Sequence, residues 1–269
     1  MINIFRRSGK FLTVAVLVSV GAFATIAYAS HSWGGYHWAR TANPFTLKVG
    51  DNVTSTWDGH LGAASNDWSV SSVLDTAVVA GQSDPKRCRP SNGRVEVCNK
   101  SYGRNGWLGV ASIWVSGSHI TQSTVKLNDS YFNTAFYNTP AWRQFVMCQE
   151  VGHAFGLDHQ DVNFNNTNLG TCMDYTNNPS RNDGLGDNLR PNTHDYDELG
   201  IIYQHLDSLT TIFNRVLGKK SATLATINND GGAEWGKVIR KSSDGRSSLH
   251  EKDLGKGDKV FTFVIWAQN

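Results

Sequence analysis

The sequence has few charged residues, no clustered basic residues and no internal repeat. Only 18% of its 269 residues are Asp, Glu, Lys or Arg, against about 25% in an average soluble protein. Lysine and arginine never form a run longer than two, which argues against a nucleic acid held by a basic patch. Aromatic residues make up 11% of the chain and include nine Trp, so general disorder is excluded. The length fits one large domain, or a domain with a small appendage.

The first 29 residues have the pattern of an export signal. A short basic segment precedes an uncharged, mainly apolar run over residues 11–24, and a small-x-small pattern follows at residues 27–29, which is typical of a signal peptidase site. An uncleaved anchor is the alternative, because residues 11–29 are just long enough to span a membrane. The cleavage pattern favours removal of residues 1–29. We therefore expect a secreted, extracellular protein, monomeric and not held at a membrane.

Cleavage changes the meaning of the charge and of the cysteines. The full chain has 25 basic and 23 acidic residues, a net charge of +2. Residues 1–29 hold three of the basic residues and none of the acidic ones, so the remainder carries a net charge of −1. The basic excess therefore says nothing about binding partners. Export into an oxidising compartment permits the four cysteines to form disulfides.

Apolar periodicity and capping residues predict both strands and helices. Strands are expected over 45–49, 95–97, 107–115, 125–127, 234–240 and 259–266. Helices are expected over 70–78 with a cap at Ser65 or Asn66, from Thr139-Pro140 to about Phe155, from Asn192-Thr193 to Tyr203, and over 206–217. A polar segment, residues 160–192, contains nine Asn among 33 residues. So long a loop in a compact domain is usually functional.

The chemistry-bearing residues are concentrated around the helix that begins after Thr139. Positions four apart on a helix project from the same face, so Gln149 and His153 lie together with Glu150 beside them. Gly156 allows the chain to leave the helix and to bring His159 back toward the same point. Two side chains from a helix and one from beyond a Gly turn form a three-ligand metal site with an open fourth position. Glu150 is then placed to act as a general base.

This segment resembles the zinc signature of metzincin metallopeptidases, H-E-x-x-H-x-x-G-x-x-H. Every defining position matches except the first, which is Gln149 instead of His. The Gly residues around His153 and His159 are similar to those of matrixins. The resemblance is specific over about residues 139–205 and extends loosely upstream to about residue 40. It implies a Zn²⁺ cofactor held by Gln149, His153 and His159, and a protein or peptide as the substrate.

Downstream, Cys172-Met173-Asp174-Tyr175 resembles the Met-turn of the same clan, fourteen residues after His159. The resemblance implies that Met173 packs beneath the metal. The spacing between Met173 and Tyr175 is similar to that of astacin-type members, where such a Tyr stabilises the transition state. Two isolated histidines on a helix would leave both the Gly turn and this second motif unexplained.

Gln149 leaves two functions open. The Gln carbonyl oxygen is a neutral ligand like imidazole, but it is a poorer donor for zinc. One interpretation is a zinc endopeptidase with a more weakly bound, more electron-poor metal. The other is a catalytically impaired pseudo-peptidase that acts as a secreted protein-binding module, with residues 206–269 as its working surface. Glu150 favours the enzyme, because a degenerate site has no use for a general base.

The four cysteines have plausible partners. A bond between Cys148 and Cys172 would tie the helix to the Met-turn, and a bond between Cys88 and Cys98 would close a loop with a turn at its tip. The sequence leaves other pairings open. Six other histidines show no ligand spacing and are expected to be surface or packed groups: His31, His37, His60, His119, His205 and His250. His194 precedes an acidic helical segment and is expected to have a capping role.

The predicted architecture is α+β. We expect a signal peptide over 1–29 and a metzincin-like catalytic domain over 30–205. This domain would contain a mixed sheet, an active-site helix, a Met-turn and a C-terminal helix. A small extension with some β-structure would follow over 206–269, with no role that the sequence reveals.

Overall fold

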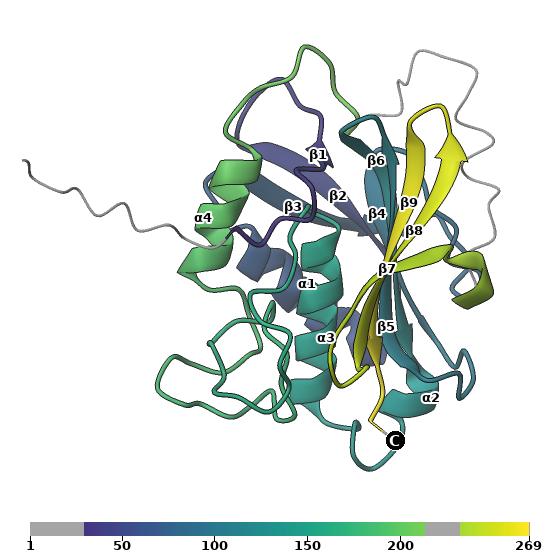
Figure 1. Ribbon diagram of the computed structural model, residues 1–269, viewed down its shortest axis with the longest axis vertical. Helices are drawn as coiled ribbons and strands as arrows, with labels where there is room; N and C mark the ends of the chain where they lie inside the picture. Colours follow the sequence, from purple (N-terminus) through teal and green to yellow (C-terminus); the bar gives the residue numbers. More distant parts are fainter. Residues whose placement is uncertain (1–29, 213–231, 269) are drawn as a thin grey trace, which may run out of the picture.

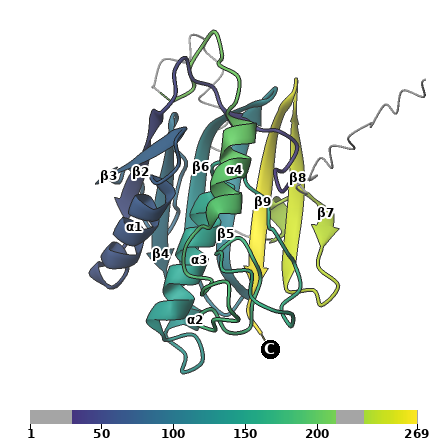
Figure 2. The same ribbon diagram turned by 90° about the vertical axis from the view of Figure 1, so that its left-hand side faces the viewer.

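The computed structural model describes residues 30–212 and 232–268, and its core is a mixed β-sheet. The strands follow the order β3-β2-β4-β6-β5-β9-β8-β7, and β1 pairs with β6 off this path. Figure 2 shows this order across the molecule, with the helices in front of the sheet. The bounds are β1 His37–Trp38, β2 Phe45–Asn52, β3 Leu74–Ala80, β4 Arg94–Lys100, β5 Trp107–Ser116, β6 His119–Asn128, β7 Lys237–Lys241, β8 Ser247–Gly255 and β9 Asp258–Trp266.

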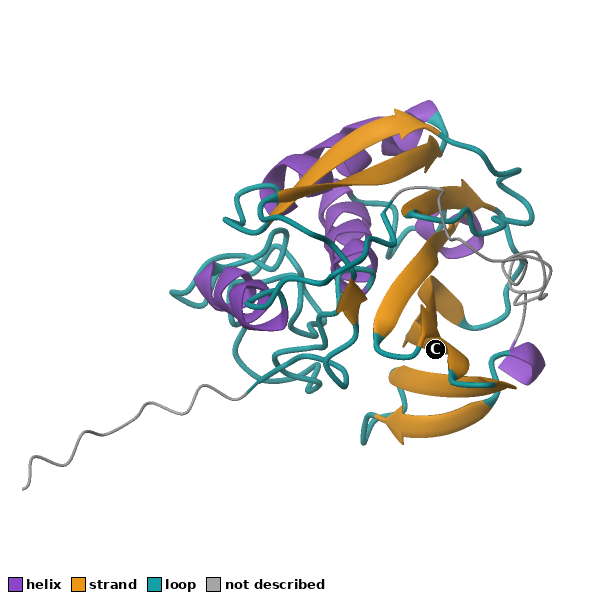
Figure 3. Cartoon of the chain, turned by 90° about the horizontal axis from the view of Figure 1, so that it is seen from above, coloured by secondary structure: helices purple, strands orange, loops and turns teal. Residues whose placement is uncertain are grey.

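The sheet has a parallel part and an antiparallel part. Strands β1, β2, β3, β4 and β6 pair in parallel, whereas β5, β9, β8 and β7 follow one another antiparallel. Six of the seven residues of β4 are buried, as expected for a central strand of a parallel sheet covered on both faces. Seen from above, the direction of the strands changes progressively across the sheet (Figure 3).

Four α-helices and one short 3₁₀ helix accompany the sheet in the described residues. They are α1 Ser55–Trp68, α2 Asp129–Phe132, α3 Pro140–His153, α4 Thr193–Ile202 and the 3₁₀ helix η1 Gly232–Glu234. Figure 1 shows α1 and α3 lying side by side against one face of the sheet. None of the described helices is both long enough and apolar enough to cross a membrane.

Helix α3 begins and ends as the sequence predicts. The Thr139 side chain accepts a hydrogen bond from the backbone N–H of Trp142, and Pro140 occupies the first helical position, where its missing N–H costs nothing. Gly156 has φ +104°, and an added Cβ would lie 2.5 Å from the backbone oxygen of Tyr36. Only glycine allows the chain to turn so sharply here. Helix α4 also follows the prediction, with a capping box between Asn192 and Asp195.

The predicted helix over 70–78 is wrong, because residues 74–80 form strand β3. Strand β3 pairs in parallel with β2, and a short apolar run cannot distinguish a helix from a strand by periodicity alone. The helix lies upstream instead, as α1. Its buried residues include Trp57, Leu61, Ala64 and Trp68, which repeat at intervals of three and four as one helical face. Two Gly residues and many polar ones masked that pattern.

The C-terminal segment also departs from the prediction. Residues 206–212 contain no helix, and residues 213–217 of the predicted helix lie outside the described residues, as do residues 1–29. The predicted strands correspond to β7 and β9, and the sequence analysis missed β8 between them. Strand β9 pairs antiparallel with β5 along nearly its whole length. The segment therefore continues the same sheet.

Candidate metal centre

Helix α3 carries three of the predicted site residues into the interior. Gln149, Glu150 and His153 lie on its last turns and are 0%, 1% and 1% exposed. The helix is wedged between α1 and strand β5. The indole of Trp68 in α1 donates a hydrogen bond to the backbone oxygen of Cys148 at 3.1 Å. The position of the three side chains is therefore set by a fully packed helix.

The turn at Gly156 brings His159 against His153. Their Nε2 atoms lie 3.0 Å apart, and their rings meet edge to face at 77°. The two residues are six apart in the sequence and would not meet on a continuous helix. The structure thus brings together the two histidines that the sequence analysis assigned to one site.

The other nitrogen of each ring has an acceptor beside it. His153 Nδ1 lies 2.8 Å from the backbone oxygen of Leu157, and His159 Nδ1 lies 3.2 Å from Oδ1 of Asp158. The Leu157 oxygen favours a proton on Nδ1 of His153 and therefore a lone pair on its Nε2. His159 Nδ1 lies within ion-pair distance of Asp158 but has no hydrogen-bond partner among the described residues. Two buried ring nitrogens 3.0 Å apart need a proton or a cation between them. Burial lowers the pKa of both imidazoles, so a metal ion fits this arrangement better than a proton.

Gln149, one helical turn before His153, has one amide atom bonded and one unpaired. Its Nε2 donates a hydrogen bond to the backbone oxygen of Cys172 at 2.9 Å. Its Oε1 is buried and has no hydrogen-bond partner among the described residues. An unpaired buried carbonyl is costly, and coordination of a metal would satisfy it. Zinc accepts imidazole nitrogen and carbonyl oxygen at about 2.0–2.2 Å, so neighbouring ligand atoms of a tetrahedral ion lie about 3.3 Å apart. The donors therefore fit zinc.

Glu150 has the environment of a proton carrier. Burial raises its pKa well above the usual range, although a hydrogen bond involving the Ala111 backbone acts in the opposite direction. Its Oε2 is buried without a partner in the described part of the chain. A Cβ added to Gly109 of β5 would lie 2.7 Å from Oε1, so the bare glycine makes room for the carboxyl group. A carboxyl group with a raised pKa is suited to accept and return protons near neutral pH.

The segment of residues 172–175 lies directly against helix α3. A Cβ on Gly152 would lie 2.7 Å from Met173 Sδ, so the thioether packs beneath the turn that carries His153. Tyr175 stacks on His159 with ring centroids 4.2 Å apart. Burial raises the pKa of Tyr175 well above its usual value, while a hydrogen bond with Ser247 acts against this rise. Tyr175 is therefore a neutral hydroxyl donor beside the histidine pair.

Two disulfides are formed in the structure. Cys148–Cys172 has a Cα–Cα distance of 5.9 Å and joins the residues that precede Gln149 and Met173. It fixes the floor of the site to the helix that carries the ligands. Cys88–Cys98 has a Cα–Cα distance of 6.0 Å and anchors a loop to strand β4. This second bond lies in the parallel part of the sheet.

Strands β7, β8 and β9, which we call the cover, lie over the candidate site. The sequence analysis did not predict this arrangement. The ring of Phe263 in β9 stacks on His153, and Arg240 Nη2 in β7 lies 2.5 Å from Asp158 Oδ1. Burial alone would raise the pKa of Asp158, but His159 and Arg240 hold it well below its usual range. Asp158 directly precedes the candidate ligand His159, so its place beside the site follows from the sequence. No local pattern marks the residues of β7 and β9 that reach the site.

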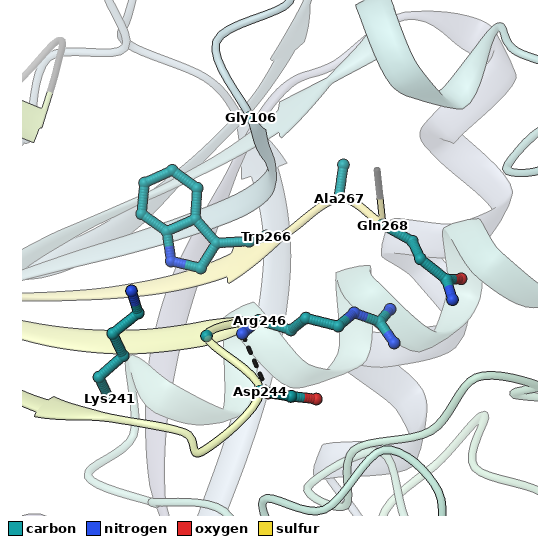
Figure 4. Close-up of a pocket in the computed structure, with 8 residues that line it drawn as sticks. Gly106, Lys241, Asp244, Arg246, Trp266, Ala267 and Gln268 are labelled. Carbon is teal, nitrogen blue, oxygen red and sulfur yellow. Dashed lines mark hydrogen bonds between the residues drawn. The ribbon is translucent and has the colours of Figure 1, made fainter.

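The pocket in Figure 4 lies elsewhere. It has a volume of about 440 Å³ and is bordered by the turn between β7 and β8 and by the end of β9. Lys241, Asp244, Arg246 and Trp266 line it, and none of the predicted ligands does. It is a surface feature of the covering strands and does not lead to the histidine pair.

No protein-family model matches the chain, and no curated protein matches it. Among solved structures, it is similar to high choriolytic enzyme 1, a hatching-enzyme zinc-protease from the medaka fish Oryzias latipes. The identity is 10%, the match covers 64% of this chain and 96% of the other, and the TM-score is 0.35. Two structures of myroilysin match at 12% identity, one covering 62% of this chain and 96% of the other with a TM-score of 0.35. The second match covers 66% of this chain and 87% of the other, with a TM-score of 0.31. Likenesses this weak carry no argument about function, which has to come from the residues of the site.

Proposed function

We propose that this chain is a secreted, zinc-dependent endopeptidase of the metzincin kind. Gln149, His153 and His159 hold the metal, and Glu150 is the general base. The observation that carries the proposal is the pair of Nε2 atoms 3.0 Å apart, with Nδ1 of His153 bonded to the Leu157 oxygen and Nδ1 of His159 3.2 Å from the Asp158 carboxylate. The unpaired oxygens of Gln149 and Glu150 lie on the same helix. Buried polar atoms without partners are expensive to maintain unless they serve chemistry.

The protein side of the mechanism rests on two proton-bearing groups. Bound zinc supplies Lewis acidity toward a water and toward the scissile carbonyl. Glu150 takes a proton from the attacking water and returns it to the leaving amine. Tyr175 donates its hydroxyl proton to the developing oxyanion, which requires that its hydroxyl leave Ser247. The Cys148–Cys172 disulfide and Met173 keep these groups in place.

Gln149 sets the strength of the site. An amide oxygen is as neutral as an imidazole, so the charge of the site equals that of a three-histidine site. It donates less electron density, so zinc is held more weakly and is more electron-poor. Its Nε2 bond to the Cys172 oxygen fixes which amide atom remains available.

The substrate is a peptide or protein, and the enzyme acts as a monomer without nucleic acid or a membrane. In the described form β9 covers His153, and a peptide bond cannot approach a residue that is 1% exposed. Strand β9 fills the edge of β5 with antiparallel hydrogen bonds. An extended peptide binds a free sheet edge in the same way. Turnover therefore requires that β7–β9 withdraw from the site.

The alternative is a pseudo-peptidase that binds proteins. It predicts that metal and Glu150 are both dispensable. The retained carboxyl group, placed against the bare Gly109, argues for the enzyme. We found no feature of the described residues that favours the binding module.

The test compares three chains expressed without residues 1–29: wild type, Glu150→Gln and Gln149→His. Zinc content and chelator-sensitive cleavage of a quenched peptide library are measured for each, with and without the added substitutions Phe263→Ala and Arg240→Ala, which weaken the contacts of β7–β9 with the site. We expect chelator-sensitive cleavage in the wild type, a loss of at least 100-fold in Glu150→Gln with zinc retained, and higher zinc content in Gln149→His. Equal, metal-independent behaviour of all three would overturn the proposal and favour the binding module.

A further inference from the structure

A second set of metal-binding side chains meets at the end of the sheet where β1 and the start of β6 lie. His37 belongs to β1, and His205 and Asp207 follow helix α4. His37 Nε2 lies 3.2 Å from His205 Nε2 and 3.5 Å from Asp207 Oδ1. His205 Nε2 lies 3.7 Å from the same oxygen. Figure 1 shows the segment after α4 reaching this end of the sheet. The sequence analysis expected both histidines to be surface or packed groups.

These three separations match the edges of a metal coordination shell. Zinc with ligands at about 2.0–2.1 Å in tetrahedral geometry places neighbouring ligand atoms about 3.3 Å apart. The observed separations of 3.2, 3.5 and 3.7 Å leave a central point close to ligand distance from all three atoms. The histidines and the carboxylate come from two segments, β1 and the stretch after α4, whose ends are far apart in the sequence.

The surrounding hydrogen bonds orient the donors inward. His37 Nδ1 lies 3.0 Å from the backbone oxygen of Gly35, which favours a lone pair on Nε2. Asp207 Oδ2 accepts bonds from the backbone N–H of Arg40 at 3.2 Å and from its Nη1 at 3.0 Å. Oδ1 is thereby turned toward the two imidazoles. Such outer partners, which fix the tautomer and the rotamer, are characteristic of metal ligands.

A fourth donor borders the cluster. His119 pairs with His37 in the register of β1 and β6, and its Nε2 lies 3.2 Å from Asp207 Oδ1. The side chains of His37 and Asp207 are 5% and 10% exposed, whereas those of His119 and His205 are 26% and 52% exposed. The cluster is thus buried on one side and open on the other, so an ion can enter from solvent.

We propose that His37, His205 and Asp207 bind a second divalent transition-metal ion, best matched by Zn²⁺, with His119 at the border of its fourth position. Two imidazoles and one carboxylate select zinc over calcium or magnesium, which prefer oxygen ligands. The ion clamps the segment after α4 onto β1. Backbone bonds from Asp207 to Arg40 and from Thr211 to Ala39 already run along the same seam. We assign the ion a structural role, because it joins two segments of the chain at this seam.

The test is the zinc content of the full mature chain after incubation with ZnCl₂ and dialysis. The key variant is His205→Asn, because this side chain is half exposed and its loss is compatible with folding. His60→Asn is the matched control, since His60 is a partly exposed histidine on α1 that bonds only Gln144. His153→Asn removes a ligand of the first site. Each is checked for folding by circular dichroism in EDTA.

We expect His205→Asn to hold one zinc equivalent fewer than wild type and His60→Asn to hold the same number. Saturating zinc should raise the Tm of His205→Asn by less than that of wild type, by a margin of about 5 °C at 100-fold excess over Kd. A wild type that holds one zinc, lost in His205→Asn and kept in His153→Asn, would support the second site while the proposed catalytic site fails. Unchanged zinc content and an unchanged Tm response in His205→Asn would overturn the inference and leave a hydrogen-bond network around Asp207.

Discussion

The ring of Phe263 lies flat against the imidazole of His153, with centroids 4.0 Å apart and an interplanar angle of 10°. Arg240 of β7 forms an ion pair with Asp158, whose carboxylate lies 3.2 Å from Nδ1 of His159. Both histidines of the candidate site are therefore in contact with β7–β9. The same strands extend the sheet from β5. Strands β7–β9 and the candidate site are thus one packed unit in this form of the chain.

Weakening the cover should increase activity. In Phe263→Ala the stacking partner of His153 is lost, and in Arg240→Ala the ion pair with Asp158 is lost. We expect the double variant to cleave a quenched peptide at least 10-fold faster than wild type at equal zinc content, because a peptide reaches the site more often. Val238→Ala is the control, since Val238 lies on β7 but is 49% exposed. Equal cleavage rates in the wild type, the double variant and Val238→Ala would show that β7–β9 do not limit access of the peptide to the site.

Replacing Gln149 by His should strengthen the metal site. Imidazole is a better donor to zinc than an amide oxygen, so we expect the zinc Kd of Gln149→His to fall by about 10–100-fold. Competition with a fluorescent chelator measures this change. Gln149→Leu is the matched control, because it keeps the volume and removes both the oxygen and the bond to Cys172. A zinc Kd that is the same in all three chains would remove Gln149 from the ligand set.

The candidate site could be predicted from the sequence because its residues are held by local rules. Gln149 and His153 are one helical turn apart, and glycine is the only residue type at position 156 that allows the chain to return to His159. The cover could not be predicted in the same way. Phe263 reaches His153 across 110 residues through strand pairing, which leaves no mark in local spacing. The second cluster is hidden for the same reason, because His37 and His205 are 168 residues apart.

The elements of the fold divide in the same way, into those with local sequence signals and those that depend on strand pairing. Helix α3 carries its own start and stop signals in Thr139 and Gly156, and the prediction there was correct. Strand β3 was predicted as a helix and helix α1 was missed, because the apolar residues from Val70 onward fit two periods and the true helix contains two glycines. Pairing with β2 decides the outcome, and tertiary context of this kind routinely overrides local propensity.

Adding a methyl group at Gly152 should distort the site. A Cβ there would lie 2.6 Å from the Trp68 ring and 2.7 Å from Met173 Sδ, and both side chains are fully buried. We expect Gly152→Ala to lose about 1–3 kcal/mol in the free energy of unfolding, measured by urea denaturation. Gly62→Ala on α1 is the control, because its Cβ would meet nothing within 4 Å. That change should stabilise by about 0.5–1 kcal/mol, and a stable Gly152→Ala would contradict the packing of Met173 against the helix.

Asp174 should make stability depend on pH. Burial raises its pKa to about 6, although bonds from the Leu169 backbone and from Asn188 act against the rise. Its Oδ1 has no partner in the described residues. In the unfolded chain the carboxyl group ionises near its ordinary value, so between about pH 4 and pH 6 the folded state binds more protons. The stabilisation is therefore complete below the unfolded pKa and is lost as the pH rises through about 6.

The matched variant is Asp174→Asn, which keeps an oxygen acceptor for both donors and cannot ionise. We expect the wild type to lose stability relative to this variant between pH 4.5 and pH 7.5, by on the order of 2 kcal/mol once solvent screening is allowed for. Urea denaturation of both chains at the two pH values measures the difference and cancels the titration of other groups. If the difference is the same at both pH values, Asp174 ionises normally in the fold, and the loop around the Met-turn is more open to water than its hydrogen bonds imply.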